Sequence, residues 1–318
     1  MIRKDKLPNP WGDDWHLDTQ PTVLDIPQGS HLQIIACTDQ WVVDKLNTPQ
    51  TTENGKLLTL NSELLTQNSN LTLNIGPDAH VELCRLQGID TPAEHLTQLR
   101  ADMQQGATLS LATITLGGTH VRNNIEVRMH GENCRLQAGG LYLVDRQQRC
   151  DNYIFVEHAA PSCFSTELYK GILDDAAQAR FNGHVLVQDG ATKTEAFQTN
   201  RNVLLTDKAH VDTRPFLEIY NDDVKCSHGS TIGQLDQQAL FYLQTRGISL
   251  RTAITMLSYA FCDEVIRMIE IPALRDIVGD MVKKRLHGEL TPCDECSIRC
   301  STPCNGLDAN FDIDPHKL

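Results

Sequence analysis

The sequence predicts a mainly β protein: a solenoid of short strands, or β-helix, followed by a small helical region. Apolar and polar residues alternate along most of the chain between about residues 23 and 233. A unit of a turn residue and a small residue recurs at nearly regular intervals there, and helical spacing of apolar residues begins near residue 234. Alternation with period two is typical of strands that bury one face.

The alternation is clear in segments such as 71–75, 109–111 and 125–127, where every second side chain is apolar. Gly, Asp and Asn residues, which favour turns, separate such segments. The segment 92–103 is the exception, because Leu96, Leu99 and Met103 have helical spacing and predict one short helix. A chain of 318 residues is long enough to bury a core without disulfide or metal support.

The recurring unit consists of a turn residue, a small residue and then an alternating stretch. It is found at Asp78-Ala79, Gly106-Ala107, Asn133-Cys134 and Lys208-Ala209. Successive units lie about 14 to 16 residues apart, or about twice that. One coil built from short strands needs about that many residues, so stacked coils would bury a continuous core. A β-sandwich remains the alternative, since it gives the same alternation but does not explain the interval.

Three helices are expected after residue 234. The first, at 235–246, ends at Gly247, and Ser249 is a suitable N-cap for the second. Pro272 ends the second helix and can begin a third, at 273–286. We expect this helical hairpin to cap the C-terminal end of the solenoid, and its exposed face is a candidate docking surface.

Composition and missing motifs exclude several functions. A net charge of -13 argues against nucleic-acid binding, and no apolar stretch is long enough to cross a membrane. The first residues lack the apolar segment of a secretory signal. Phosphate-binding loops, His-Glu-x-x-His and Gly-x-Ser-x-Gly are absent from the sequence. We therefore expect no nucleotide hydrolysis through such a loop, and nothing in the sequence points to a β-helix polysaccharide lyase or hydrolase.

Cysteine usage points to a reducing compartment and to one metal-binding candidate. The chain has 11 cysteines, an odd number, and most stand alone. Four gather near the C-terminus, at Cys293, Cys296, Cys300 and Cys304. Their thiolates could hold zinc or an iron–sulfur cluster. The alternative is a tail whose thiols have no common ligand.

Cys226 and His228 form a second candidate site. Residues two apart in a strand point to the same side. In the repeat register, Cys226 takes the place of Val81, Leu109, Leu136 and Val211, and His228 is level with Leu83 and Leu111. A thiol and an imidazole on one face could share a soft metal or a sulfur species. Alternatively, the cysteine is a small core residue and the histidine is only hydrogen-bonded.

The stretch 202–247 carries a family resemblance. It contains Leu204-Leu205-Thr206-Asp207-Lys208-Ala209, Val211-Asp212-Thr213-Arg214-Pro215, Asp222-Asp223-Val224-Lys225-Cys226-Ser227-His228-Gly229 and Gly233-Gln234-Leu235-Asp236. These strings closely resemble the SufB/SufD family of iron–sulfur cluster assembly proteins. The similarity continues more loosely from about 100 to 290, and 1–25 and 291–318 lie outside it. The string around Cys226 and His228 is the SufD form, and Ala209 stands where SufB carries a thiol.

The resemblance implies a right-handed parallel β-helix flanked by helical regions. In the family, SufB and SufD pair through their β-helices, and C-terminal helices dock the ABC-type ATPase SufC. The complex builds a nascent cluster from persulfide sulfur and iron in the bacterial cytoplasm. The N-terminal helical region usual in SufD is largely missing from this chain, and the Cys-rich tail is not a usual SufD feature.

We therefore expect a cytoplasmic, SufD-like scaffold subunit without catalytic turnover. His228 and Cys226 would contribute to a transient iron–sulfur cluster at the SufB–SufD interface, and SufC would dock on Leu257, Phe261 and Val265. The expected divisions are an arm at 1–22, a β-helix core at 23–233, a helical region at 234–290 and a Cys-rich tail at 291–318. The alternatives are a stand-alone homodimeric metal or cluster carrier that uses the tail, and a β-helix carbohydrate-active enzyme. A homodimer in isolation is also compatible with the scaffold role.

Overall fold

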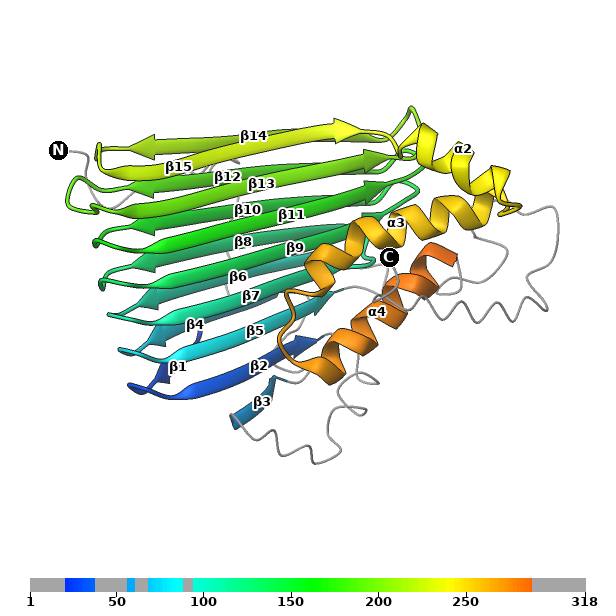
Figure 1. Ribbon diagram of the computed structural model, residues 1–318. Coiled ribbons are helices and arrows are strands. Elements are labelled where there is room, and N and C mark those ends of the chain that lie inside the picture. The colour runs from blue at the N-terminus through cyan, green and yellow to red at the C-terminus, as the bar shows by residue number, and fades with distance from the viewer. Residues whose placement is uncertain (1–20, 38–55, 61–67, 88–93, 288–318) are drawn as a thin grey trace.

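The computed structural model describes residues 21–37, 56–60, 68–87 and 94–287. Residues 1–20 of the expected arm at 1–22 and the four cysteines of the tail lie outside the described residues. The described residues form two parallel sheets, which three helices follow in the chain (Figure 1). None of the helices in the described ranges has the length and apolar character needed to cross a membrane.

The strands alternate between the two sheets. Sheet A consists, in spatial order, of β1 (Thr22–Ile26), β4 (Asn68–Ile75), β6 (Glu94–Met103), β8 (His120–Met129), β10 (Arg149–His158), β12 (Gln178–Val187) and β14 (His210–Ile219). Sheet B consists of β3 (Lys56–Leu60), β2 (His31–Cys37), β5 (His80–Gln87), β7 (Thr108–Thr115), β9 (Arg135–Val144), β11 (Phe164–Leu173), β13 (Thr194–Leu204) and β15 (Val224–Gly233).

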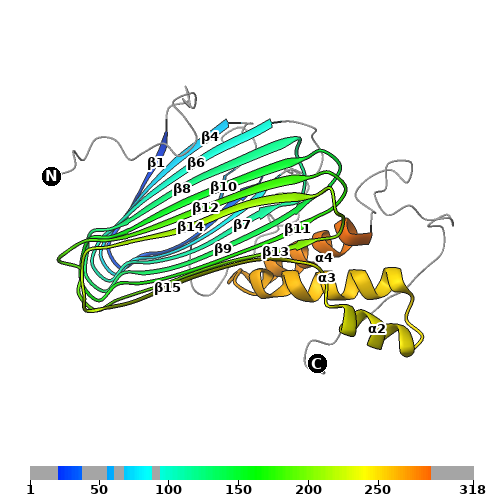
Figure 2. The same ribbon diagram turned by 90° about the horizontal axis from the view of Figure 1, so that it is seen from above.

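Each sheet is parallel, and this confirms the β-helix over the β-sandwich. A sandwich places antiparallel strands in its sheets, whereas here each strand from β4 to β13 pairs in parallel with the strand two further along the chain. His80 pairs with Thr108, so a full coil takes 28 residues and contains two strands. The interval of about 14 to 16 residues is therefore half a coil, contrary to our expectation. Figure 2 shows the sheets meeting in short turns at one side and splaying apart at the other.

Three of the expected turn and small-residue units are confirmed at connections that lead from sheet A to sheet B, whereas Lys208-Ala209 lies at the opposite connection, between β13 and β14. Asp78, Gly106 and Asn133 have positive φ, and each is followed by a buried small residue. Gly106 has a further reason to be glycine, since a Cβ there would lie 2.2 Å from Asp78 Oδ1. The left-handed residue turns the chain, and the small residue fits between the converging sheets.

The helix expected at 92–103 is wrong, because this segment is strand β6. Its buried side chains are His95, Thr97, Leu99, Ala101 and Met103, which follow a period of two. Two of these inward positions are polar, so hydropathy concealed the alternation. Leu96 is only half-buried and faces the other side of the sheet.

The three expected helices are confirmed as α2 (Gln237–Thr245), α3 (Leu250–Ile266) and α4 (Pro272–His287). Ser249 caps α3 by accepting a hydrogen bond from the Thr252 amide, and Gly247 has a φ of 84° after α2.

The helices do not cap the end of the solenoid, as we expected. They lie along the outer face of sheet B, as Figures 1 and 2 both show. One apolar cluster joins outward residues of sheet B to α3 and α4: Ile35, Cys84, Leu86, Ile114, Leu141, Leu143 and Ile172 with Cys262, Val265, Leu274, Val278 and Met281. The outer face of sheet B is apolar enough to need a cover, and this requirement fixes the helices there. The last coil is left open.

Leu274 on α4 tests how strongly this cover stabilises the fold. Its side chain is fully buried in the cluster. Leu274→Ala should lower the free energy of unfolding by about 2–5 kcal/mol, because it leaves a cavity between helix and sheet. Leu250→Ala, at a position 51% exposed, should change it by less than about 0.5 kcal/mol. Urea denaturation measures both, and equal small effects would mean that the helices are only loosely attached.

Candidate functional site

Cys226 and His228 lie on β15, the last strand of sheet B. β15 pairs with β13 on one side, and within the described ranges no strand pairs with its other edge. Cys226 is half-buried and His228 is exposed. Both occupy positions that point into the solenoid on earlier coils, since Cys226 pairs with the buried Ala196 and His228 with the buried Gln198. The two side chains therefore line the open end of the interior.

The in-register pairing places each residue at the end of a column. The first column is Val81, Leu109, Leu136, Ser165, Ala196 and Cys226, and the second is Leu83, Leu111, Ala138, Glu167, Gln198 and His228. The expected alignment is thus confirmed, except for Val211. That residue lies on β14 in sheet A and pairs with Ala179. The second column changes from apolar to polar as it approaches the open end.

A buried carboxyl–amide pair stands directly before His228 in this column. Gln198 Nε2 donates to Glu167 Oε2 at 2.7 Å, and both side chains are buried. Desolvation raises the pKa of Glu167 from its ordinary value near 4.5 to about 8. Gly183 on the opposite sheet makes room for the pair, because a Cβ there would lie 2.3 Å from Gln198 Nε2. A polar path therefore reaches from the closed interior to the open end.

A second set of buried polar side chains lies on the side of the interior where the two sheets splay apart. Asn123 accepts hydrogen bonds from Gln87 at 2.7 Å and Thr97 at 2.8 Å, and it donates to Asn152 at 2.9 Å. Arg85 donates to Thr97, and burial lowers the pKa of its guanidinium to about 10. These groups are paired with one another across neighbouring coils, which is how a solenoid accommodates polar residues in its interior.

The open coil also exposes apolar side chains. Phe216, Ile219 and Tyr220 at the end of sheet A, and Ile232 on β15, are each at least 40% exposed. Thr213 and Ser230 hydrogen-bond at 2.8 Å between the last two strands. Unpaired strand edges bordered by exposed apolar residues are typical of a surface that pairs with another chain.

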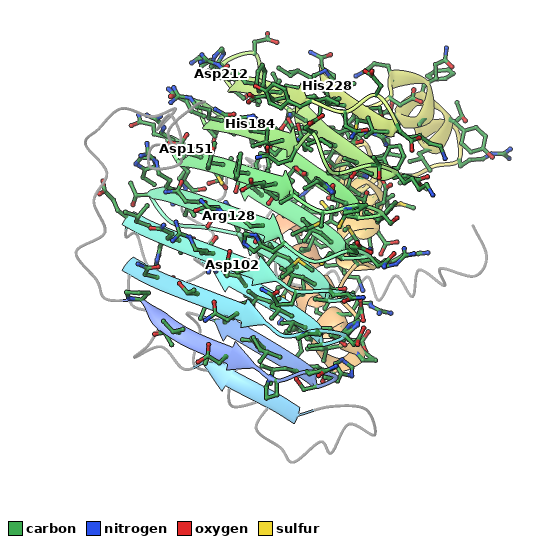
Figure 3. The ribbon with its side chains drawn as sticks, turned by 90° about the vertical axis from the view of Figure 1, so that its left-hand side faces the viewer. Asp102, Arg128, Asp151, His184, Asp212 and His228 are labelled. Carbon is green, nitrogen blue, oxygen red and sulfur yellow. The ribbon has the colours of Figure 1, made fainter. Side chains whose placement is uncertain are left out.

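The outer face of sheet A, in contrast, is charged and internally paired. Figure 3 labels residues along it: Asp102, Arg128, Asp151, His184 and Asp212, with His228 beyond them at the last coil. Asp102 pairs with His130 at 2.9 Å, Asp151 with His120 and Arg149 at 3.0 Å, and His184 with Glu218 at 3.2 Å. These groups satisfy each other, so we interpret this face as a solvated surface.

The proposed docking residues differ in their exposure. Leu257 and Phe261 are half-buried, and Lys170 Nζ lies 4.6 Å from the Phe261 ring centroid. Val265 has no exposed surface and packs in the cluster against sheet B, so its side chain is not available to a partner. The apolar spacing of α3 could not tell which residues face the sheet. The exposed apolar residues of the helical region are instead Phe241 at 69%, Tyr242 at 56% and Leu250 at 51%.

The described cysteines also differ in how exposed their side chains are. Cys37, Cys84, Cys134, Cys150, Cys163 and Cys262 are buried, which leaves Cys226 as the accessible thiol within the described part of the chain. Partial burial raises the pKa of Cys226, so its thiol is protonated at neutral pH in the isolated chain. Cys293, Cys296, Cys300 and Cys304 lie outside the described residues.

One further group escaped the sequence analysis. His31, His80 and Glu82 bring three possible metal-ligand atoms within 4.8 Å of one another. The two histidines are far apart in the sequence and meet only through the pairing of β2 with β5. Histidines also begin β8 and β14, so the position of His31 and His80 at the start of a strand did not single them out.

Comparison with known proteins supports the family resemblance. A family model described as "SUF system FeS cluster assembly, SufBD core domain" matches residues 47–261. The iron-sulfur cluster assembly protein SufD of Escherichia coli is 36% identical over 217 residues, which cover 68% of this chain and 51% of that protein. A SufBD family protein of Mycobacterium leprae is 37% identical over 190 residues, 57% of this chain and 48% of its own.

A SufBD family protein of Synechocystis is 32% identical over 211 residues, which cover 66% of this chain and 47% of that protein. The chain spans about half the length of the curated relatives it matches.

The raised pKa of Glu167 predicts a pH dependence of stability. Below pH 4.5 the carboxyl is protonated in both the folded and the unfolded chain. Between pH 4.5 and about 8 the unfolded chain releases the proton while the folded chain keeps it, so stability falls as pH rises. The slope is at most about 1.4 kcal/mol per pH unit, and the total is on the order of a few kcal/mol.

Glu167→Gln should remove this decrease, since an amide can still accept the hydrogen bond from Gln198. The variant should match the native chain near pH 4.5 and exceed it in stability above pH 8. Urea unfolding at a series of pH values measures the difference. Glu195→Gln, which removes an exposed ion pair with Lys225, should keep the native slope. Parallel curves for Glu167→Gln and the native chain would contradict the burial argument.

Proposed function

Because the chain belongs to the SufB/SufD family of the SUF iron–sulfur cluster assembly system, we propose that it is a SufD-like scaffold subunit. In this proposal it pairs with SufB, binds the SufC ATPase and contributes to assembly of a nascent cluster in the cytoplasm. It performs no catalytic turnover of its own. One observation carries the proposal: His228 and Cys226 line the interior at a coil that is open and bordered by unpaired strand edges.

The open coil is suited to a β-helical partner such as SufB. Both β14 and β15 end their sheets in the described ranges, so an incoming coil can extend the two sheets by strand addition. Phe216, Tyr220 and Ile232 would lose their exposed apolar surface on contact. A partner in this position would close the interior and bring its own ligands next to His228.

The chemistry of the two residues fits iron and sulfur as cargo. An imidazole nitrogen is a good ligand for iron, and a thiolate is a good ligand for iron and an acceptor of sulfur. The raised pKa of Cys226 makes His228 the better ligand in the isolated chain. Two ligands at an exposed position hold a metal ion weakly, which suits a site that must release its product to another protein.

The helical region is the proposed SufC-docking region, at 234–290. Phe241 and Tyr242 on α2 and Leu250 at the start of α3 are exposed, and Leu257 and Phe261 are half-buried further along α3. Large aromatic side chains are common anchors of protein interfaces. The docking surface proposed now is centred on Phe241 and Tyr242, and it replaces the contribution expected from Val265.

His228 can be tested in the assembled complex. With SufB and SufC co-expressed, His228→Ala should lower the iron and acid-labile sulfide bound to the complex several-fold, because an assembly ligand is lost. The size and subunit ratio of the complex should not change. His130→Ala, an exposed histidine on the outer face of sheet A, is the control and should retain full cluster content. Full cluster content in His228→Ala would contradict a ligand role and would mean that His228 is an ordinary strand residue.

If the two docking surfaces serve different partners, substitutions in each surface should weaken the binding of one partner only. Phe241→Ala with Tyr242→Ala should weaken SufC binding at least about tenfold and leave SufB pairing intact. Phe216→Ala with Tyr220→Ala should do the reverse. Titration calorimetry with each purified partner measures both. Substitutions are preferable to deletion of the helices, since deletion would uncover the apolar face of sheet B. Loss of neither interaction would contradict both surface assignments.

A further inference from the structure

The described residues contain a second cluster of metal-ligand type, at the opposite end of the solenoid from His228. His31 starts β2, and His80 and Glu82 lie on β5, with His31 paired to His80 and Gln33 paired to Glu82. Four strands of sheet B separate β5 from β15. At about 4.8 Å per strand the two sites are about 24 Å apart. The cluster therefore has no direct contact with the open coil.

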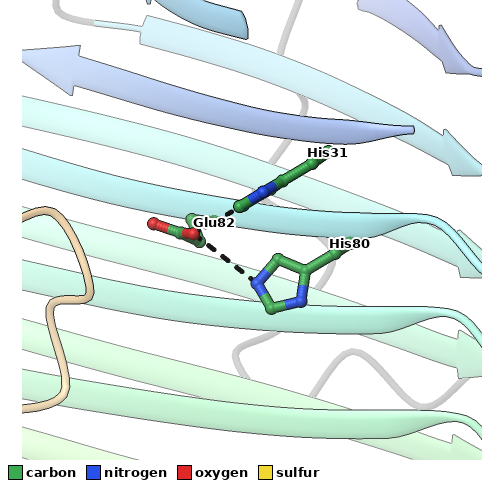
Figure 4. A group of neighbouring side chains, drawn as sticks. All are labelled: His31, His80 and Glu82. Carbon is green, nitrogen blue, oxygen red and sulfur yellow. Dashed lines mark hydrogen bonds and ion pairs between the residues drawn. The ribbon is translucent and has the colours of Figure 1, made fainter. Parts of the chain in front are cut away.

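The three side chains converge on the outer face of sheet B (Figure 4). His31 Nε2 lies 2.7 Å from Glu82 Oε1, and His80 Nε2 lies 3.6 Å from the same oxygen. A second carboxylate comes from Glu270, in the connection between α3 and α4, whose Oε2 is 3.4 Å from His80 Nε2. The ligand atoms of His31, His80 and Glu82 thus lie within 4.8 Å of one another, and the Glu270 carboxylate lies beside His80.

His80 Nε2 lies within ion-pair distance of both carboxylates. It is shielded from solvent, and it makes no hydrogen bond to any residue that the structure describes. The contact between His31 and Glu82 satisfies those two groups but contributes nothing to His80. A buried nitrogen that faces two carboxylate oxygens without bonding either one is suited to share a cation with them.

The second oxygen of the Glu82 and Glu270 carboxylates accepts a hydrogen bond from a neighbouring side chain. Gln33 Nε2 donates to Glu82 Oε2 at 2.9 Å, and Ser110 Oγ donates to Glu270 Oε1. These bonds turn Glu82 Oε1 and Glu270 Oε2 toward His80. Outer contacts of this kind orient the ligands in known metal sites.

Two of the separations between ligand atoms are already close to those of tetrahedral ligation. Metal–ligand bonds of about 2.0–2.1 Å put neighbouring ligand atoms about 3.3 Å apart. The separations of 3.4 and 3.6 Å around His80 Nε2 are close to this value. The contact of 2.7 Å between His31 and Glu82 must open by about 0.6 Å when a metal replaces that hydrogen bond. Glu270 is not among the three residues whose ligand atoms all lie within 4.8 Å of one another, so its exposed side chain must move closer to bind the same ion.

We propose that His31, His80, Glu82 and Glu270 form a site for one divalent first-row metal ion, Zn²⁺ or Fe²⁺. Imidazole with carboxylate is a ligand set that both ions accept. Because Glu270 belongs to the helical region, the metal links the α3–α4 connection to the N-terminal coils and stabilises their association. This site is independent of the proposed cluster-assembly role, and neither requires the other.

The test uses the full chain with Cys293, Cys296, Cys300 and Cys304 changed to Ser, so that the tail thiols do not bind the added metal. After chelation and dialysis, Co²⁺ is titrated as the probe, followed by absorption of its d–d bands and by calorimetry. We expect one equivalent of Co²⁺, with the intense bands of tetrahedral nitrogen and oxygen ligation. Zn²⁺ should displace it and raise the melting temperature, and an Fe²⁺ titration under anaerobic conditions compares the two physiological ions.

His80→Gln should weaken Co²⁺ binding at least tenfold to a hundredfold and abolish the thermal shift with Zn²⁺. His130→Gln, a histidine of similar exposure on sheet A, is the matched control and should bind like the parent. His31→Gln is the second variant, in case His80→Gln does not fold as judged by circular dichroism. The absence of stoichiometric binding in the parent would overturn the proposal, as would parental affinity in either folded variant.

Discussion

The structure depends on the in-register, parallel pairing of each strand with the strand one coil away. This pairing puts the same face of every coil inside, so a side chain has its column neighbours as permanent partners. A polar residue inside can persist only if its neighbours satisfy it, as Gln198 does for Glu167. On the last coil the column has no next neighbour within the described chain, and Cys226 and His228 consequently face an opening. Gln198 is buried because β15 lies next to it in the column, and His228 is exposed because no described strand follows β15.

The helices determine which surfaces remain available. Lys170, buried on sheet B, donates to the Phe261 carbonyl at 2.9 Å and pairs with Glu264, while Arg285 pairs with Asp145 at 2.7 Å. These charged contacts and the apolar cluster hold α3 and α4 against sheet B. A buried charge without its partner is costly, so the helices cannot shift toward the end of the solenoid without loss of stability. The open coil and the surface of α2 thereby remain free for partners.

The sequence predicted what is local or strictly periodic. Alternation and the turn with its small residue identified the strands, and because column register follows from that repeat, Cys226 and His228 were aligned correctly with Leu109 and Leu111. Prediction failed where tertiary context decides. Strand β6 carries polar inward residues, so its period was hidden, and the buried face of α3, with Val265, is chosen by sheet B. The pairing of His31 with His80 depends on how the first coils stack, which no local pattern encodes.

The two histidine sites differ in the way that their proposed roles require. A transient cargo needs an accessible position with few ligands, because each additional ligand and each ångström of burial slows release. His228 meets that requirement, being exposed and supported by one half-buried thiol. A retained metal needs several ligands whose orientation is fixed beforehand, and Glu82 and Glu270 are fixed by Gln33 and Ser110. The length of the solenoid separates the two sites: the α3–α4 connection lies beside one of them, whereas the other faces the coil that we propose a partner completes.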